Sequence, residues 1–148
     1  VGYLARALCR RQASGRATAR IDLAIRLADN AEPDLANIHR LGEGWVAEET
    51  LAVAIYCALR HTDDFSASII AAVNHCGDST GAVTGNILGA LLGYDAIGEA
   101  WTRDLELRDV ILELADDLDR RPECLQDRRG VDRDWTQKYV EGRALPTV

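Results

Sequence analysis

Apolar residues recur at intervals of three and four along most of this chain, which is the spacing of a helix that turns one face toward a core. The clearest apolar stripe belongs to a helix predicted over residues 104–119 and consists of Leu107, Val110, Ile111, Leu114 and Leu118. Asp104 suits the capping position of that helix, and its other face is strongly acidic, which is typical of a solvated surface. No window shows the alternation of a strand, so the pattern predicts an all-α fold.

Other stretches repeat the helical pattern. Further helices are expected at about 3–13, 17–28 and 46–60 and, after Asp63-Asp64, through Ser68, Ile69, Ile70 and Val73. In the helix over 46–60 the buried stripe is predicted to be Leu51, Ala54, Ile55, Ala58 and Leu59. Pro33 ends the connection that follows the helix at 17–28. A loop from Pro122 to Asp134 precedes a short C-terminal segment around Trp135 and Tyr139. We expect a single all-α domain over 1–148, with a loop-rich tail over 120–148.

Composition narrows the class of protein. The 148 residues carry a net charge of −7, which argues against a general nucleic-acid binder because phosphates require a basic surface. No apolar run reaches the length of a membrane span and no signal-like segment opens the chain, so a cytoplasmic protein without a membrane partner is expected. The four cysteines form no CxxC pair and are predicted to be free thiols in a reducing compartment. The absence of methionine indicates a non-standard start or a fragment of a longer protein.

The front of the chain is basic, with six arginines against one aspartate in residues 1–26. We interpret this segment as solvated helix that complements acidic surface elsewhere. Binding of phosphate or nucleic acid is the alternative, and it predicts a steep dependence of affinity on salt.

Glycines stand four residues apart at Gly77, Gly81, Gly85, Gly89 and Gly93. Each glycine inside a helix costs about 0.8–1.0 kcal/mol relative to alanine, so such a helix needs a reason to keep them. The expected reason is close approach of a second helix in the core.

Oxygen-bearing side chains gather where this glycine helix begins. Asp78, Ser79 and Thr80 are all good N-cap residues, so a cap is the simplest interpretation. A site for a hard cation is the alternative, because Mg²⁺ prefers carboxylate and hydroxyl oxygens. One carboxylate is too few to hold such an ion, so other ligands would come from elsewhere in space.

The run from Asn74 to Ala90 resembles the C-terminal signature of the ADP-ribosylglycohydrolase family, and the stretches 44–49 and 105–110 are also similar to its members. The resemblance implies an orthogonal multi-helix bundle whose cleft holds two Mg²⁺ or Mn²⁺ ions. It implies hydrolysis that releases ADP-ribose from a modified protein side chain or a small acceptor. By the same resemblance Asp78 and Thr80, or Ser79 under another gap placement, are metal ligands, whereas no catalytic residue is assigned.

The chain departs from the family pattern in two respects. The Gly77–Gly81 motif is two residues shorter than usual and lacks a second carboxylate, and the chain covers about the C-terminal half of the family's extent. A degenerate or truncated member that serves as a binding or structural domain is therefore the alternative function. Thr62-Asp63-Asp64 spells the family's N-terminal metal motif in the wrong part of the pattern, and we interpret it as a helix-capping loop.

The remaining candidate groups carry less information. Glu48 and Glu49 are possible acid–base groups, but consecutive residues cannot both face inward, and a surface position is expected. The three histidines, His39, His61 and His75, show no metal-ligand spacing and are predicted to be structural or surface residues.

Overall fold

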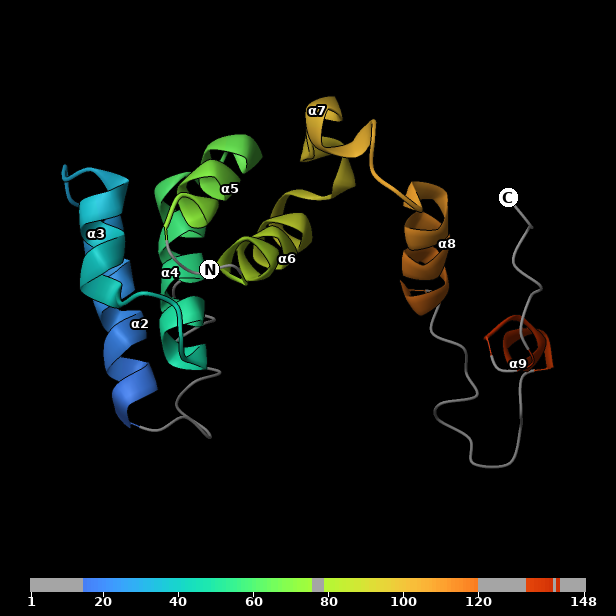
Figure 1. Ribbon diagram of the computed structural model, residues 1–148, viewed down its shortest axis with the longest axis horizontal. Coiled ribbons are helices and arrows are strands. Elements are labelled where there is room, and N and C mark those ends of the chain that lie inside the picture. The colour runs from blue at the N-terminus through green and yellow to red at the C-terminus, as the bar shows by residue number, and fades with distance from the viewer. Residues whose placement is uncertain (1–14, 76–78, 120–132, 140, 142–148) are drawn as a thin grey trace. The chain divides into compact units, whose positions relative to one another are not determined.

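The computed structural model describes residues 15–75, 79–119, 133–139 and 141. Every regular element in this part of the chain is a helix, which confirms the all-α prediction (Figure 1). The helices are α2 (Gly15–Ala28), α3 (Asp34–Leu41), α4 (Ala47–Arg60), α5 (Phe65–Val73), α6 (Thr80–Leu92), the 3₁₀ turn η1 (Tyr94–Ala96), α7 (Glu99–Thr102), α8 (Arg108–Asp119) and α9 (Arg133–Tyr139). They divide into two compact units, Val1–Arg103 and Asp104–Val148.

Helix α4 is the centre of the first unit, where it contacts α2, α3, α5 and α6 (Figure 1). All seven residues from Ala52 to Ala58 are buried, so α4 is apolar around most of its circumference. Of the predicted stripe, the alanine and isoleucine positions are buried, whereas Leu51 and Leu59 are only partly covered. A stripe on one face underestimates the burial of a helix that has neighbours on several sides.

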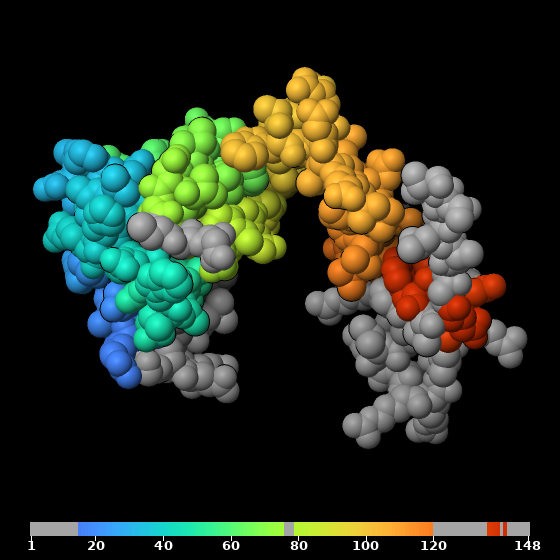
Figure 2. Space-filling view, viewed as in Figure 1, coloured from blue at the N-terminus to red at the C-terminus, as the bar shows by residue number. Residues whose placement is uncertain are grey.

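The core around α4 is made of small and branched aliphatic side chains from the neighbouring helices. Its members outside α4 are Ile21, Ala24, Leu27, Ile38, Leu41, Ala71 and Ala72. The helices α2 to α6 close over this core as one continuous body in the space-filling view (Figure 2). Cys57 is a buried free thiol, and burial raises its pKa to about 12, which keeps it protonated at neutral pH.

The loop between α4 and α5 behaves as predicted. Asp64 is the N-cap of α5, and its carboxylate accepts a hydrogen bond of 2.9 Å from the backbone N–H of Ala67. This confirms that Thr62-Asp63-Asp64 is a helix-capping loop.

Helix α3 was not predicted. Pro33 takes its N-cap position with φ −59° and ψ 147°, so the proline starts a helix as well as ending a gap. The helix has eight residues, of which only Asn37, Ile38 and Leu41 are buried. Eight residues cover little more than two helical turns, which is too short a window for a reliable apolar period.

The second unit contains α8 and α9. Helix α8 starts at Arg108, four residues later than predicted, because Leu107 has a left-handed φ of +57° that a continuous helix cannot contain. The ion pair of 2.6 Å between Lys138 Nζ and Glu113 Oε1 joins α9 to the acidic face of α8, together with contacts of Lys138 and Tyr139 to Asp117.

The apolar stripe of α8 is exposed, contrary to the amphipathic pattern that suggests a covered face. The exposed side chains are Leu107, Val110, Ile111, Leu114 and Leu118. A helical period identifies the face but does not supply the surface that covers it.

Some sequence predictions concern residues outside the described part of the chain. These are the helix at 3–13, Asp78, the thiols other than Cys57, and the predicted loop from Pro122 to Asp134 except its last two residues, which belong to α9. Within the residues that are described, no helix is long and apolar enough to cross a membrane.

Candidate functional site

Helix α6 begins at the residues for which a metal site was predicted. Ser79 occupies its N-cap position with φ −82° and ψ −13°, is exposed, and makes no side-chain capping hydrogen bond. The capping interpretation is therefore not realised by Ser79. Asp78 lies outside the described residues.

Thr80 is the unusual residue of this helix start. Its side chain is fully buried, and its Oγ1 has no hydrogen-bond partner among the described residues. Thr84, one turn later, is equally buried, but its hydroxyl donates a bond of 2.8 Å to the carbonyl of Thr80. Leaving a buried hydroxyl without a partner costs about 1–3 kcal/mol, and this distinguishes Thr80 from Thr84.

The glycine face of α6 packs most closely on α5 at the beginning of α6. A Cβ at Gly81 would lie 2.6 Å from Cγ1 of Val73, and a Cβ at Gly85 would lie 3.7 Å from Cδ1 of Ile69. A Cβ at Gly89 would meet nothing within 4 Å. The predicted close approach of a second helix is thus confirmed at Gly81, is looser at Gly85 and is wrong at Gly89.

We expect Gly89→Ala to stabilise the protein by about 1 kcal/mol, because alanine is the better helix former and the space is open. Gly81→Ala should be less stable than this control by about 1–3 kcal/mol, because Val73 is β-branched and cannot swing aside freely. Urea unfolding of both variants measures the difference. Equal stability would mean that α5 and α6 are not closely packed at Gly81.

Of the two predicted acid–base candidates, Glu48 and Glu49, the second is a structural residue, and its side chain is only 16% exposed, contrary to the expected surface position. Glu49 Oε1 forms an ion pair of 3.0 Å with Arg20 Nη2, and Arg20 also donates to the carbonyl of Leu41. These contacts join α2, the end of α3 and the start of α4. For Arg20, the interpretation that the basic front complements acidic groups is confirmed.

A polar network that the sequence did not reveal links α3 and α4. Asp34 Oδ2 lies 2.8 Å from His61 Nε2, and Asp34 Oδ1 accepts a bond of 2.6 Å from the hydroxyl of Tyr56. The Tyr56 oxygen accepts in turn from Asn37 Nδ2 at 3.1 Å. Asp34 and His61 are 27 positions apart and belong to no recognised motif, so only the fold brings them together.

These contacts change the pKa values of Asp34 and Tyr56. Burial by itself would raise the pKa of Asp34, but hydrogen bonds from Tyr56 and His61 and the charges of His61 and Arg60 outweigh it and lower the pKa below 3.8. Burial and the bond to the carboxylate raise the pKa of Tyr56 to about 12. Asp34 is therefore an anion at neutral pH, and Tyr56 is a neutral donor.

The lowered pKa of Asp34 makes a prediction about stability. When folding lowers the pKa of a carboxylate, the ionised group stabilises the folded protein at pH values above its ordinary pKa of 3.8. This stabilisation is lost as the pH falls through the lower pKa of the folded state. Wild type should therefore lose more stability than Asp34→Asn between neutral and acidic pH, as measured by urea unfolding. Parallel pH profiles of the two proteins would contradict the assignment.

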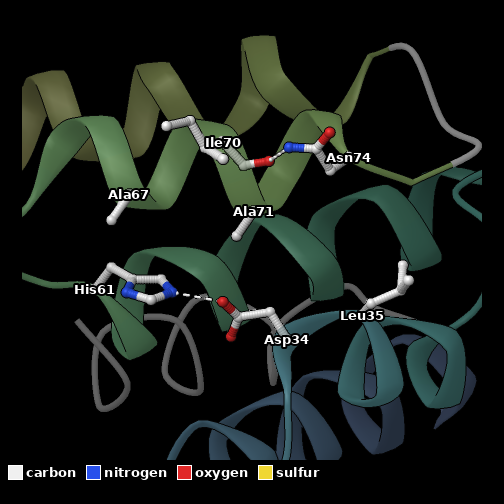
Figure 3. Close-up of a pocket in the computed structure, with 7 residues that line it drawn as sticks. All are labelled: Asp34, Leu35, His61, Ala67, Ile70, Ala71 and Asn74. Carbon is white, nitrogen blue, oxygen red and sulfur yellow. Dashed lines mark hydrogen bonds and ion pairs between the residues drawn. The ribbon is translucent and has the colours of Figure 1, made fainter.

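A pocket of about 440 Å³ opens beside this network (Figure 3). Its lining residues are Asp34, Leu35, His61, Ala67, Ile70, Ala71 and Asn74. Ala67, Ile70 and Ala71 lie on one face of α5 and Asn74 is its C-cap, whereas Val73 and Ile69 on a different face of that helix meet the glycines of α6. The pocket and the start of α6 are thus separate features of the first unit.

The described residues hold no cluster of three or more histidine, cysteine, aspartate or glutamate side chains suited to a metal ion. Of the predicted ligands, the structure places Thr80 in the interior and Ser79 at the surface. Burial of Thr80 is the signal that sequence inspection lacked, since both residues carry a hydroxyl.

Comparison with known proteins adds one match. No curated protein and no solved structure matches the chain. The family model described as ADP-ribosylglycohydrolase matches residues 3–128, which includes the whole of the first unit from residue 3 and all of α8. The chain therefore belongs to the ADP-ribosylglycohydrolase family.

Proposed function

We propose that the protein is a metal-dependent hydrolase that removes ADP-ribose from a modified protein side chain or a small acceptor. Family membership supports the reaction class. The observation on which the metal dependence rests is the buried hydroxyl of Thr80, which has no partner among the described residues. The cofactor would be Mg²⁺ or Mn²⁺.

The residues at the start of α6 fit such an ion in their chemistry. A threonine hydroxyl has lone pairs for a cation, and a carboxylate two positions earlier in sequence, Asp78, is the preferred hard ligand. Asp78 and Thr80 would hold the ion, with Ser79 as the alternative hydroxyl. Once bound, a divalent ion polarises ligand oxygens and lowers the pKa of water, which is the chemistry that glycosidic hydrolysis needs.

The chain's own contribution is to hold Thr80 rigidly in a dry position. The neighbouring residue Gly81 packs against Val73, and the hydroxyl of Thr84 donates to the carbonyl of Thr80. Both contacts restrict movement of the first turn of α6, which contains Thr80. A constrained, desolvated oxygen loses little entropy when a cation binds.

Replacement of Thr80 by valine tests the metal site. Because valine has nearly the shape of threonine and removes an unpaired hydroxyl, Thr80→Val should keep or slightly increase stability while it weakens Mn²⁺ or Mg²⁺ binding measured by calorimetry. Thr84→Val is the matched control, because it removes a satisfied hydrogen bond at a cost of about 1 kcal/mol and should leave metal binding unchanged.

Ser79→Ala tests whether Ser79, rather than Thr80, is the hydroxyl ligand. Loss of metal affinity in Ser79→Ala, with none in Thr80→Val, would transfer the ligand role to Ser79. If wild type produces no heat with either metal, the metal proposal is wrong.

The activity is tested with mono-ADP-ribosylated peptide and the full chain. Release of free ADP-ribose that stops when a chelator is added supports the hydrolase. Binding of ADP-ribose without turnover at any metal concentration supports the alternative, a degenerate member of the family that serves as a binding domain.

A further inference from the structure

The pocket beside Asp34 has one apolar side and one polar side (Figure 3). On α5, Ala67, Ile70 and Ala71 present aliphatic surface, and Leu35 faces them from α3. The leucine and Ile70 are about half exposed, so apolar surface at the opening remains accessible. Small-molecule sites commonly have this volume and combine such a wall with a few polar groups.

The polar side offers acceptors. An ionised carboxylate only accepts, so the proton between Asp34 and His61 belongs to Nε2 of the histidine. Each carboxylate oxygen can accept more than one hydrogen bond, and the Asp34 side chain is 30% exposed. At the other end of the pocket, Asn74 Nδ2 donates 2.7 Å to the carbonyl of Ile70, which directs the donor end of this amide to the backbone.

His61 and Arg60 both contribute positive charge beside Asp34, but the carboxylate side chain remains 30% exposed. Arg60 Nη1 donates to the carbonyls of Ala28 and Asn30, and Arg60 Nε lies 3.7 Å from Asp34 Oδ1, beyond hydrogen-bond distance. The guanidinium is therefore held by the backbone rather than by the carboxylate. A ligand that brings a positive charge and hydrogen-bond donors complements this side of the pocket.

We propose that this pocket binds a small organic ammonium ion, whose charged group contacts Asp34 and whose hydrocarbon part lies against Leu35, Ile70 and Ala71. This site is independent of the proposed hydrolase centre, because it uses a different face of α5 from the one that meets Gly81. The two proposals can therefore fail separately.

A series of probes with one shape and three charges tests the proposal. Benzylammonium, benzyl alcohol and benzoate are titrated into the full chain, and binding is followed by the chemical shifts of backbone amides in α3 and α5. The cation should bind saturably and perturb both helices. The alcohol should bind roughly fivefold more weakly, as expected for loss of about 1 kcal/mol from a partly exposed ion pair, and benzoate should bind least.

Variants assign the effect to the pocket. Asp34→Asn should remove the preference for the cation over the alcohol, whereas Asp63→Asn, an exposed carboxylate outside the pocket, should preserve it. Because Asp34→Asn also alters the network with Tyr56, a second variant is needed, and Leu35→Gln should weaken all bound probes without affecting the core.

Three outcomes would overturn the proposal. These are absence of saturable binding of benzylammonium, equal binding of benzoate, and a cation preference that survives in Asp34→Asn while the protein remains folded.

Discussion

Replacement of Tyr56 by alanine is expected to destabilise the protein by about 3–5 kcal/mol, the range for removing a large buried aromatic side chain. Tyr56 is fully buried at the middle of α4 and is a member of the central hydrophobic cluster. Its ring occupies space between helices that cannot collapse without moving α4, which α2, α3, α5 and α6 all contact. Urea unfolding followed by far-UV circular dichroism measures the loss.

Tyr56→Phe separates the hydroxyl from the ring. It should cost about 1–3 kcal/mol, because Asp34 loses a donor at 2.6 Å and Asn37 loses an acceptor at 3.1 Å while both remain in place. A cost equal to that of Tyr56→Ala would mean that the hydrogen bonds, not the packing, explain the stability. A cost near zero in both variants would contradict the burial of this residue.

Gly42→Ala is the second substitution with a large expected effect. Gly42 ends α3 with φ +125° and ψ −179°, a conformation that is essentially restricted to glycine. A Cβ there would lie 2.4 Å from Cδ of Glu49, so the substitution also displaces the carboxylate that pairs with Arg20. We expect strain of about 1–3 kcal/mol, with a further loss from the disrupted contact.

Gly93→Ala is the matched control for this prediction. Gly93 has a similar backbone conformation, with φ 81° and ψ 169°, but a Cβ there would meet nothing within 4 Å. The difference in unfolding free energy between Gly42→Ala and Gly93→Ala therefore measures the clash with Glu49. If the two variants are equally destabilised, the packing of Glu49 over Gly42 contributes nothing.

Predictions from sequence succeeded where the determinants are local. Helix α5 follows from Asp64 at its cap and the apolar run from Ile69 to Val73, and α4 follows from its spacing and the glutamates in its first turn. Helix α8 shows the limit of this approach, because the apolar period continues through Leu107 although the backbone there is left-handed. Periodicity reports which residues share a face and not where the backbone turns.

For the candidate sites too, the sequence revealed what depends on neighbouring residues and not what depends on packing. The run from Asn74 to Ala90 was sufficient to indicate the family, which the family match over residues 3–128 confirms. The sequence could not distinguish Ser79 from Thr80 as the hydroxyl ligand, since both are adjacent hydroxyl residues at a helix start. Their different burial depends on how the first turn of α6 packs against the neighbouring helices. The metal site itself stays a prediction.

By itself, the sequence determined the helical class, the family and the position of the glycine helix, because these depend on residues close together in the chain. Only the tertiary structure decided that Asp34, Tyr56 and His61 share one network, that Thr80 is enclosed, and that the stripe on α8 is exposed. Contacts between distant residues depend on how helices pack. Packing follows from the shapes of all the side chains together, and no short pattern in the sequence contains that information.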